Sequence, residues 1–236
     1  MPTFAESVIA FNQSLQFTGA LPQGIEVMNP FRENPAALAA SSSFYRKYYN
    51  DRLPRIMMLG INPGRFGAGL TGVPFTDPKR LESECDIHCY AGPPAHEPSS
   101  VFIYEVIRQY GGVSQFYSRV YINSICPLGF VAKQANGREV NYNYYDNSVL
   151  AEAARPFMLE CLRRQLDFGI QREVCFVLGT GKNMDFISRL NREYGFFEQV
   201  VPLEHPRYII QYKSRQSQVY IDKYLDLINK YSREQE

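Results

Sequence analysis

Polar side chains occur beside glycine and proline in four short stretches of the sequence, and each stretch adjoins an apolar run. The stretches span residues 61–78, 123–128, 180–181 and 204–207. They supply amide, hydroxyl and imidazole groups, such as those of Asn62, Ser124 and His205, which can form hydrogen bonds to a ligand. Groups of this kind can orient a water molecule and stabilise charge that develops on a reacting molecule, and neither task requires a metal ion.

The apolar runs next to these stretches are typical of buried β-strands. They cover Arg55–Gly60, Arg119–Ile125, Glu173–Gly179 and Gln199–Leu203. Helical patterns cover Ser99–Tyr110, Val149–Phe168, Lys182–Tyr194 and Ser217–Tyr231, and two helices are predicted upstream, one after a capping box of Thr3 and Glu6 and one over Asn34–Tyr49. Strands that alternate with helices predict an α/β fold with a central, mainly parallel four-stranded sheet flanked by helices.

Ligands of such a sheet bind beyond the carboxyl ends of its strands, so the four polar stretches should converge on one rim. The chain has 236 residues, of which 45% are hydrophobic, and this is enough for one sizeable core. We therefore expect a single domain over residues 1–236, with N-terminal helices over about residues 1–50 and an α/β core over about residues 51–236. Ala135–Arg138 resembles a hairpin loop at the surface.

The overall charge gives no sign of a nucleic-acid partner. The formal net charge is +1, from 25 Lys and Arg against 24 Asp and Glu. A local basic face would still suffice to contact phosphates. The sequence lacks an apolar run of about 18 residues and a signal peptide, so we expect a soluble protein without a membrane partner, in the cytoplasm or, in a eukaryotic host, the nucleus.

Two patterns could suggest a bound cofactor, and we interpret neither in that way. Cys85, His88 and Cys89 lack further ligands at a recognisable spacing, and five cysteines in all suit free thiols. The run Gly67–Gly72 matches G-x-G-x-x-G, but Pro74 and Pro78 interrupt the helix that a dinucleotide site needs. We expect no metal and no cofactor.

Three motifs carry a resemblance to a known family. Gly60–Gly67, followed by Thr71–Phe75, resembles the first motif of the single-strand-selective monofunctional uracil-DNA glycosylases, a branch of the uracil-DNA glycosylase superfamily. Ser124–Leu128 resembles the family's second motif and His205-Pro206 its closing motif, so the resemblance covers most of the chain. It implies a monomeric, divergent bacterial-type DNA glycosylase of base excision repair, which flips uracil out of DNA and hydrolyses its N-glycosidic bond.

The resemblance assigns roles to individual residues. Asn62 corresponds to the amide that positions the attacking water. The alternative is a structural role, in which the Asn side chain forms hydrogen bonds only within its own turn, as Asn often does before Pro. His205 corresponds to the histidine that donates a hydrogen bond to the uracil carbonyl as negative charge develops there. Phe75 corresponds to the aromatic that stacks on the flipped base, with a plain core residue as the alternative. Ile61 and Gly64 would line the base pocket, and Gly64 would leave room for a hydroxymethyl group at C5 of the base.

Ser124 departs from the family pattern, which has Asn at this position to read the Watson-Crick edge of uracil. A hydroxyl cannot reproduce the two contacts of an amide, but it can both donate and accept. Weaker selectivity for uracil follows, and a deaminated purine such as xanthine or hypoxanthine becomes an admissible substrate. The neighbouring Asn123 could compensate only if the strand were locally rotated.

The residues that follow the third motif also depart from the family. The family's wedge segment, which enters the DNA, therefore cannot be assigned residue by residue in this sequence. Arg207, Lys213 and Arg215 alternate with Tyr208 and Tyr212, a composition that can contact phosphates and fill the gap left by a flipped base. The alternative is a β-turn and strand with solvated charges.

The remaining charged residues near the motifs are interpreted one by one. Arg65 stands where the family tends to have Pro and is a further candidate phosphate contact. We interpret Asp77 as a turn or cap acceptor before Pro78 rather than a general base. No lysine falls on a motif position, so no strand-cleaving step is expected.

The competing functional hypothesis is a non-catalytic module of the same fold that binds damaged DNA or a nucleotide.

Overall fold

Four parallel strands form the central sheet in the computed structural model, which describes residues 1–232. The strands are β2 (Arg55–Gly60), β3 (Val120–Ser124), β6 (Ile170–Leu178) and β7 (Gln199–Leu203), in the order β3-β2-β6-β7. Every neighbouring pair is parallel, and all six residues of the inner strand β2 are buried. The predicted α/β fold is confirmed, and the main difference is that β6 begins at Ile170 rather than Glu173.

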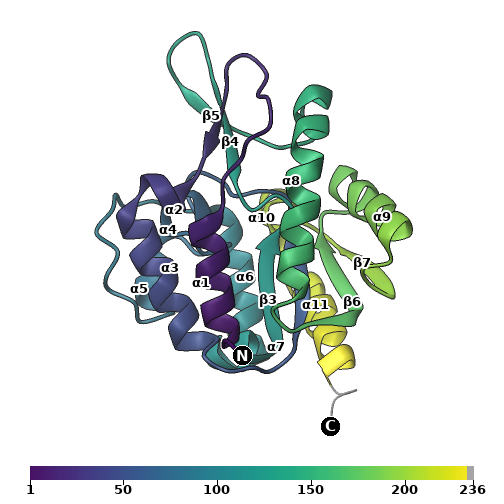
Figure 1. The fold of residues 1–236 in the computed structure, drawn as a ribbon. Coiled ribbons are helices and arrows are strands. Elements are labelled where there is room, and N and C mark those ends of the chain that lie inside the picture. Colours follow the sequence, from purple (N-terminus) through teal and green to yellow (C-terminus); the bar gives the residue numbers. More distant parts are fainter. Residues whose placement is uncertain (233–236) are drawn as a thin grey trace.

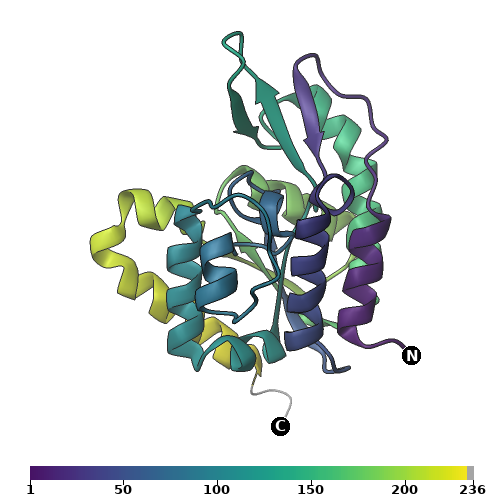
Figure 2. The same cartoon turned by 90° about the vertical axis from the view of Figure 1, so that its left-hand side faces the viewer.

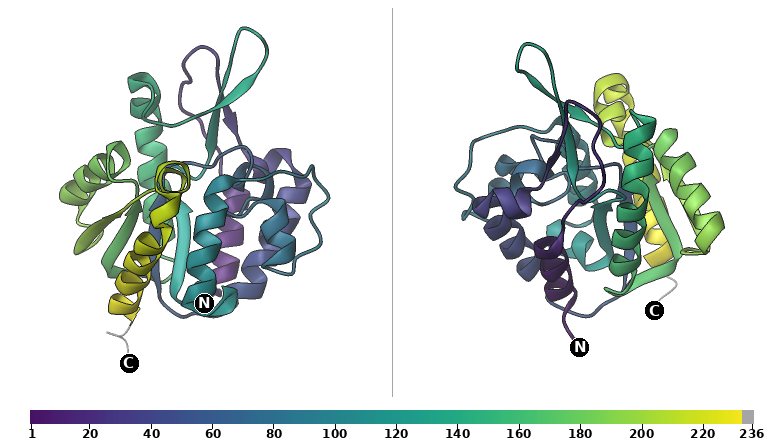
Figure 3. Two further views of the ribbon diagram at one scale, coloured as in Figure 1. Left: turned by 180° about the vertical axis from the view of Figure 1, so that it is seen from behind. Right: turned by 45° about the horizontal axis from the view of Figure 1, so that its top comes forward.

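Long helices cover both faces of this sheet (Figures 1 and 3). In Figure 1, α1 (Phe4–Ser14) and α8 (Ser148–Leu166) lie in front of the sheet, and α6 (Pro98–Tyr110) and α11 (Ser217–Ser232) lie behind it. The other long helices are α3 (Pro35–Tyr48), which packs against α1, and α9 (Lys182–Tyr194), which connects β6 to β7. No helix within residues 1–232 has both the length and the apolar character needed to cross a membrane.

Side-chain caps explain where the first helices begin. Thr3 and Glu6 form the predicted capping box, with the Glu6 carboxylate accepting from the Thr3 N–H over 2.7 Å. At α3 the Asn34 side chain accepts from the N–H groups of Ala36 and Ala37, and Pro35 occupies the first turn. The shorter helices are α2 (Pro30–Glu33), α4 (Ala68–Thr71), α5 (Pro78–Ser83), α7 (Val113–Arg119), α10 (Pro206–Tyr212) and the 3₁₀ turn Ser214–Gln216.

A second, antiparallel sheet was not predicted. It contains β1 (Ile25–Met28), β4 (Gly129–Lys133) and β5 (Glu139–Tyr142), in the order β1-β4-β5. Figures 1 and 2 show it projecting from the end of the molecule at which the central strands finish. These strands have four or five residues and no regular alternation of buried and exposed positions, so their sequences gave no clear pattern. The predicted hairpin loop over Ala135–Arg138 joins β4 to β5.

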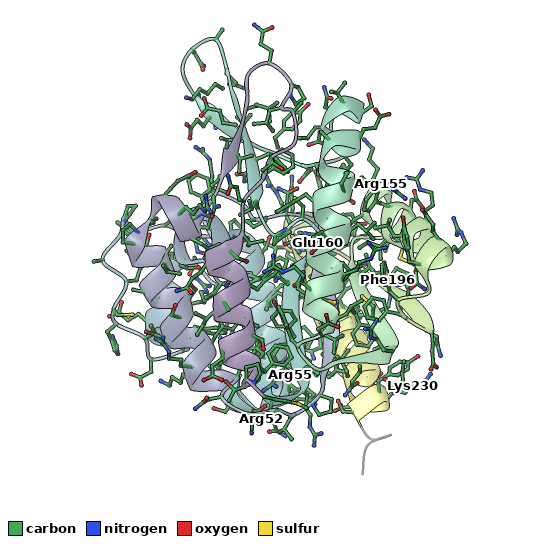
Figure 4. All side chains as sticks on the ribbon, viewed as in Figure 1. Arg52, Arg55, Arg155, Glu160, Phe196 and Lys230 are labelled. Atoms are coloured by element: carbon green, nitrogen blue, oxygen red, sulfur yellow. The ribbon has the colours of Figure 1, made fainter. Side chains whose placement is uncertain are left out.

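A buried arginine anchors the opposite, amino edge of the central sheet (Figure 4). Arg55 is fully buried, lies 4.6 Å from the ring centroids of both Phe4 and Tyr49, and donates to the Asp51 carboxylate through two nitrogens. Its Nε also donates to the Tyr117 carbonyl over 2.8 Å. This network ties the first helix to the start of β2 at the edge away from the polar rim.

The Cys85, His88 and Cys89 segment does not gather as a set of ligands. Cys85 is buried with its Sγ 3.1 Å from the Tyr104 hydroxyl, whereas Cys89 is exposed. His88 instead contacts the Asp86 carboxylate over 2.9 Å at the surface. Within residues 1–232, no three His, Cys, Asp or Glu side chains are grouped as a metal site would require.

Candidate active site

A cleft of about 730 Å³ opens at the carboxyl edge of the central sheet. Residues from all four predicted polar stretches line it, so the expected convergence is confirmed. From these stretches come Ile61, Asn62, Gly64, Phe75, Ser124, Gly181, His205 and Arg207. The loop after β5 and the start of α6 complete the wall, and neither segment was predicted to take part.

The Asn62 side chain is held by backbone groups from a distant segment rather than only by its own turn. Its Nδ2 donates to the Tyr142 carbonyl over 3.1 Å and, less directly, to the Pro63 carbonyl over 3.4 Å. Its Oδ1 accepts from the Tyr144 N–H over 3.1 Å. Because a carbonyl oxygen has two lone pairs, one remains for a water molecule in the cleft. The end of β5 therefore fixes the orientation of this amide.

His205 stands at the start of α10, where the His-Pro sequence determines its conformation. Pro206 occupies the first helical position, and His205 before it is extended, with φ −64° and ψ 134°. The Nδ1 atom accepts a hydrogen bond from the Arg207 N–H over 3.2 Å. Burial, together with the nearby Arg207 charge, lowers the pKa of His205 to about 4. The imidazole is therefore neutral at physiological pH, with its proton on Nε2 as a donor.

Phe75 packs beside His205 in a strained turn. The centroids of the two rings lie 5.9 Å apart, and Phe75 is 9% exposed. Its φ of +52° is unusual for a bulky residue, and such strain persists only where surrounding bonds enforce it. The buried Thr71 hydroxyl supplies them, since it accepts from the Val73 N–H over 3.1 Å and donates to the Thr76 carbonyl over 2.6 Å. Phe75 therefore lies at the boundary of core and cleft, since it packs in the hydrophobic core and also lines the cleft.

Ser124 ends β3 with its hydroxyl near the cleft, whereas its neighbour points elsewhere. The Ser124 Oγ would lie 3.4 Å from a Cβ atom at Gly60, and the Phe75 ring borders the same point. In contrast, the Asn123 Nδ2 donates to Gln165 and Tyr121 over 2.7 Å each, on the side of the sheet that α8 covers. Asn123 therefore cannot replace the missing amide in this conformation.

Gly64 and Asn141 lie close together where they line the cleft. A Cβ atom at Gly64 would find only the Asn141 Nδ2 within 4 Å, at 3.5 Å. The Oδ1 atom of Asn141 accepts from the Arg65 N–H over 3.0 Å, which ties β5 to this turn. Asn141 lines the cleft but was not predicted as a site residue, because the strand that carries it was not recognised.

The basic segment after His205 is helical, so the alternative of a β-turn and strand is wrong. Pro206 begins α10, and Arg207 and Tyr208 line the cleft from its first turn. The Tyr208 and Tyr212 side chains are 43% and 65% exposed, with ring centroids 5.6 Å apart. Lys213 and Arg215 follow the helix and line neither this cleft nor the adjoining one that Arg65 lines.

A buried carboxyl group, that of Glu97, also lines the cleft, and it was not predicted from the sequence. Its Oε2 atom is buried without a hydrogen-bond partner among the described residues, and its carboxyl group packs against Gly67. Burial and the nearby Asp77 charge raise the pKa of Glu97 to about 8. Glu97 is therefore mainly protonated at neutral pH.

Asp77 has the structural role expected for it. Its side chain caps α5, with Oδ1 accepting from the Arg80 N–H over 2.9 Å. The other oxygen accepts from the Glu97 N–H over 2.9 Å and from the Ser100 hydroxyl over 3.1 Å. Asp77 is fully buried, and it does not line the cleft.

The far side of the rim carries residues that follow β5 and β6. Asn143, Tyr145 and Lys182 line the cleft there, and the Lys182 Nζ lies 5.5 Å from the centroid of the Tyr145 ring. The predicted rim position of Thr180-Gly181 is the only signal that could have indicated Lys182, which follows directly. The cleft thus combines a flat aromatic surface, neutral donors and acceptors, and cationic groups at its margin.

Comparisons with known proteins agree with this geometry. The family model described as the uracil DNA glycosylase superfamily matches residues 46–229. The crystal structure of wild-type SMUG2 from Pedobacter heparinus is similar to this chain, with 53% sequence identity and a TM-score of 0.96. That match covers 99% of this chain and 100% of the other. No curated protein matches the chain.

Proposed function

The chain belongs to the uracil DNA glycosylase superfamily, and from this membership we propose that it hydrolyses the N-glycosidic bond of uracil in DNA. The bond between C1′ of the deoxyribose and the base nitrogen breaks, and its electron pair leaves with the base. Water adds to C1′ and loses a proton, while the base anion gains one. The products are a free base and an abasic site, which is the first step of base excision repair.

The observation that carries this proposal is the pair of Asn62 and His205 on one cleft beside Phe75. A base that enters the cleft can stack on the Phe75 ring, a contact worth about 1 to 3 kcal/mol in nucleic-acid binding. Donors fixed in advance toward developing charge lower a barrier because they need no reorganisation during the reaction. This cleft offers such a donor and, at Asn62, an acceptor for water.

His205 acts as a neutral electrophile in this mechanism. Its Nδ1 is occupied by the Arg207 N–H, so Nε2 carries the proton and donates it as a hydrogen bond to the base carbonyl. Negative charge grows on that oxygen as the bond to C1′ breaks. Loss of one comparable donor typically costs about 3 kcal/mol of transition-state stabilisation.

Asn62 orients the water through the free lone pair of Oδ1. An amide is too weak a base to remove a proton before attack, so the water adds to a sugar that already carries positive charge. The bonds to Tyr142 and Tyr144 hold the amide in place while this occurs.

The range of substrates depends on Ser124 and Gly64. The Ser124 hydroxyl makes no side-chain hydrogen bond to any described residue, and it can donate to one base or accept from another. We propose that xanthine and hypoxanthine are admitted together with uracil for this reason. Gly64 leaves space beside the base, which supports excision of hydroxymethyluracil as well.

The DNA contacts proposed for the margin are Arg65, Arg207, Tyr208, Lys213 and Arg215. The exposed rings of Tyr208 and Tyr212 could fill the space that a flipped nucleotide leaves in the duplex. Such a protein can act as a monomer, because one chain supplies every residue that the mechanism uses.

Base release from oligonucleotides with uracil, hydroxymethyluracil, xanthine or hypoxanthine, in EDTA, tests the proposal. We expect release by the wild-type chain and a fall of about a hundredfold or more in His205→Ala. Borohydride should trap no covalent complex with Lys182 if the enzyme is monofunctional. Absence of release from all four substrates by a folded protein would favour the non-catalytic binding module instead.

A further inference from the structure

A second cleft, of about 700 Å³, adjoins the base pocket. The two share residues from four segments, including Gly64, Glu97, Asn141 and Arg207. The second cleft continues from these toward the hairpin of the projecting sheet, where Arg138 and Val140 line it. A DNA strand with one base in the base pocket could therefore continue along this cleft.

Three arginines from separate parts of the fold line the second cleft. Arg65 lies in the turn after β2, Arg138 in the loop between β4 and β5, and Arg207 in the first turn of α10. Their backbone groups form hydrogen bonds, but their guanidinium groups form none within residues 1–232. None of the three forms an ion pair there, whereas Arg108 and Arg155 elsewhere on the surface do. Uncompensated positive charge on three unrelated segments is typical of an anion site.

The carboxyl group in this cleft does not cancel that charge at neutral pH. Glu97 is mainly protonated because it is buried and lies near the Asp77 carboxylate. The Asp77 carboxylate forms an ion pair with Arg80, whose Nη1 lies 3.4 Å from its Oδ2. In addition, Pro98 and Ser99 bring the amino end of the thirteen-residue helix α6 to the cleft, and such an end favours anions.

From this arrangement we infer that the arginine cleft, lined by Arg65, Arg138 and Arg207, binds a phosphate of the damaged strand next to the flipped nucleotide. The inference rests on the proposed function, which places that nucleotide in the adjoining pocket. Arg138 is the new contact, since it lines this cleft from the loop between β4 and β5. Figure 2 shows the sheet that holds this loop projecting from the body of the molecule. The damaged strand, rather than its complement, is favoured because the two clefts are continuous.

Equilibrium binding of single-stranded DNA tests this contact without requiring base release. The probe is a fluorescent oligonucleotide with one tetrahydrofuran abasic analogue, and the proteins are the wild-type full chain and Arg138→Gln. We expect the Kd to rise about threefold to tenfold in the variant. The slope of log Kd against log salt should fall by about 0.7, the value for one phosphate contact on a single strand.

The matched control is Arg192→Gln, because Arg192 is an exposed arginine in the last turn of α9 and lines neither cleft. It should leave both the Kd and the salt slope unchanged. A methylphosphonate placed at each phosphate near the analogue should weaken wild-type binding at one or two positions. At one of them it should have no further effect on Arg138→Gln, since both changes remove the same contact.

The outcomes separate this inference from the proposed function. Equal Kd and salt slope for Arg138→Gln and wild type would overturn the inference, whether or not the wild type releases uracil. An effect of Arg138→Gln that appears only with duplex DNA would place the contact on the complementary strand and overturn the assignment made here. Failure of uracil release with a positive binding result would instead reject the proposed reaction alone.

Discussion

The backbone N–H of Arg207 donates to Nδ1 of His205 over 3.2 Å, and this bond selects one tautomer of the ring. The proline between them fixes the start of α10, so the same short sequence places the ring and saturates one of its nitrogens. Protonation of Nδ1 would remove this acceptor, so the bond requires a neutral ring with its single proton on Nε2. Burial keeps the ring neutral, because it disfavours the imidazolium form.

The titration of His205 is the first prediction. At pH 7, nitrogen-15 NMR of the imidazole should find the proton on Nε2, and the ring should gain a second proton only near its pKa of about 4. Because this folded-state pKa is below the unfolded value of 6.5, the group stabilises the fold above pH 6.5 and loses that contribution as the pH falls through 4. A midpoint near 6.5, or a protonated Nδ1, would contradict the assigned tautomer.

Replacement of Asn62 should separate catalysis from binding. In Asn62→Ala the water loses its acceptor, and we expect base release to slow by about a hundredfold or more in single-turnover assays. Binding of an abasic-analogue oligonucleotide should change little, because the amide contacts water and backbone. Stability should fall by about 1 to 3 kcal/mol, since the Tyr142 carbonyl and the Tyr144 N–H lose their partner. Equal losses in binding and in release would instead place Asn62 at the DNA surface.

Substitution of Ser124 tests how the pocket distinguishes bases. Ser124→Asn restores an amide beside Gly60 and Phe75, and we expect selectivity for uracil over xanthine to increase about tenfold or more. The measurement is the ratio of kcat/KM for the two bases in matched oligonucleotides, with Ser124→Ala as the control that removes the hydroxyl alone. If the ratio for Ser124→Asn does not increase, the position does not read the base.

The central sheet could be predicted because each of its strands is a continuous apolar run. All six residues of β2 are buried, so the pattern needs no alternation to be recognised. The second sheet could not, because strands such as β5 are only partly buried and stabilised mainly by pairing with residues far along the chain. Asn141 and Arg138 belong to this sheet, and their places at the two clefts therefore became visible only in the folded structure.

Some site residues could likewise be predicted from the sequence, and others could not. Asn62, Phe75 and His205 are recognisable because they occur in motifs with proline or glycine, which restrict the local backbone. Their mutual positions agree with the prediction, since all three line one cleft. Glu97 has no such motif: its environment is created by Gly67 and Asp77, which are distant from it in the sequence. A raised pKa of this kind arises from burial, which sequence spacing does not encode.

Glu97 gives the last prediction, which concerns stability and pH. Its folded-state pKa of about 8 is above the unfolded value of 4.5, so its contribution to stability is complete below pH 4.5 and is lost as the pH rises through 8. Over this interval Glu97 should lower the free energy of unfolding by at most about 1.4 kcal/mol per pH unit. The charges that act on it are Asp77, which opposes ionisation, and Arg80 and Arg207, which favour it.

Glu97→Gln should remove this dependence, because the amide resembles the protonated acid in size and cannot ionise. Urea unfolding at pH 5.5 and pH 8 should therefore find the variant gaining stability relative to the wild type at the higher pH. Glu160→Gln is the control, since Glu160 is exposed on α8 (Figure 4) and forms no side-chain bond within the described residues; its stability relative to wild type should be the same at both values. Parallel changes with pH in wild type and Glu97→Gln would mean that Glu97 is ionised throughout, and the arginine cleft would then carry one fewer net positive charge at neutral pH.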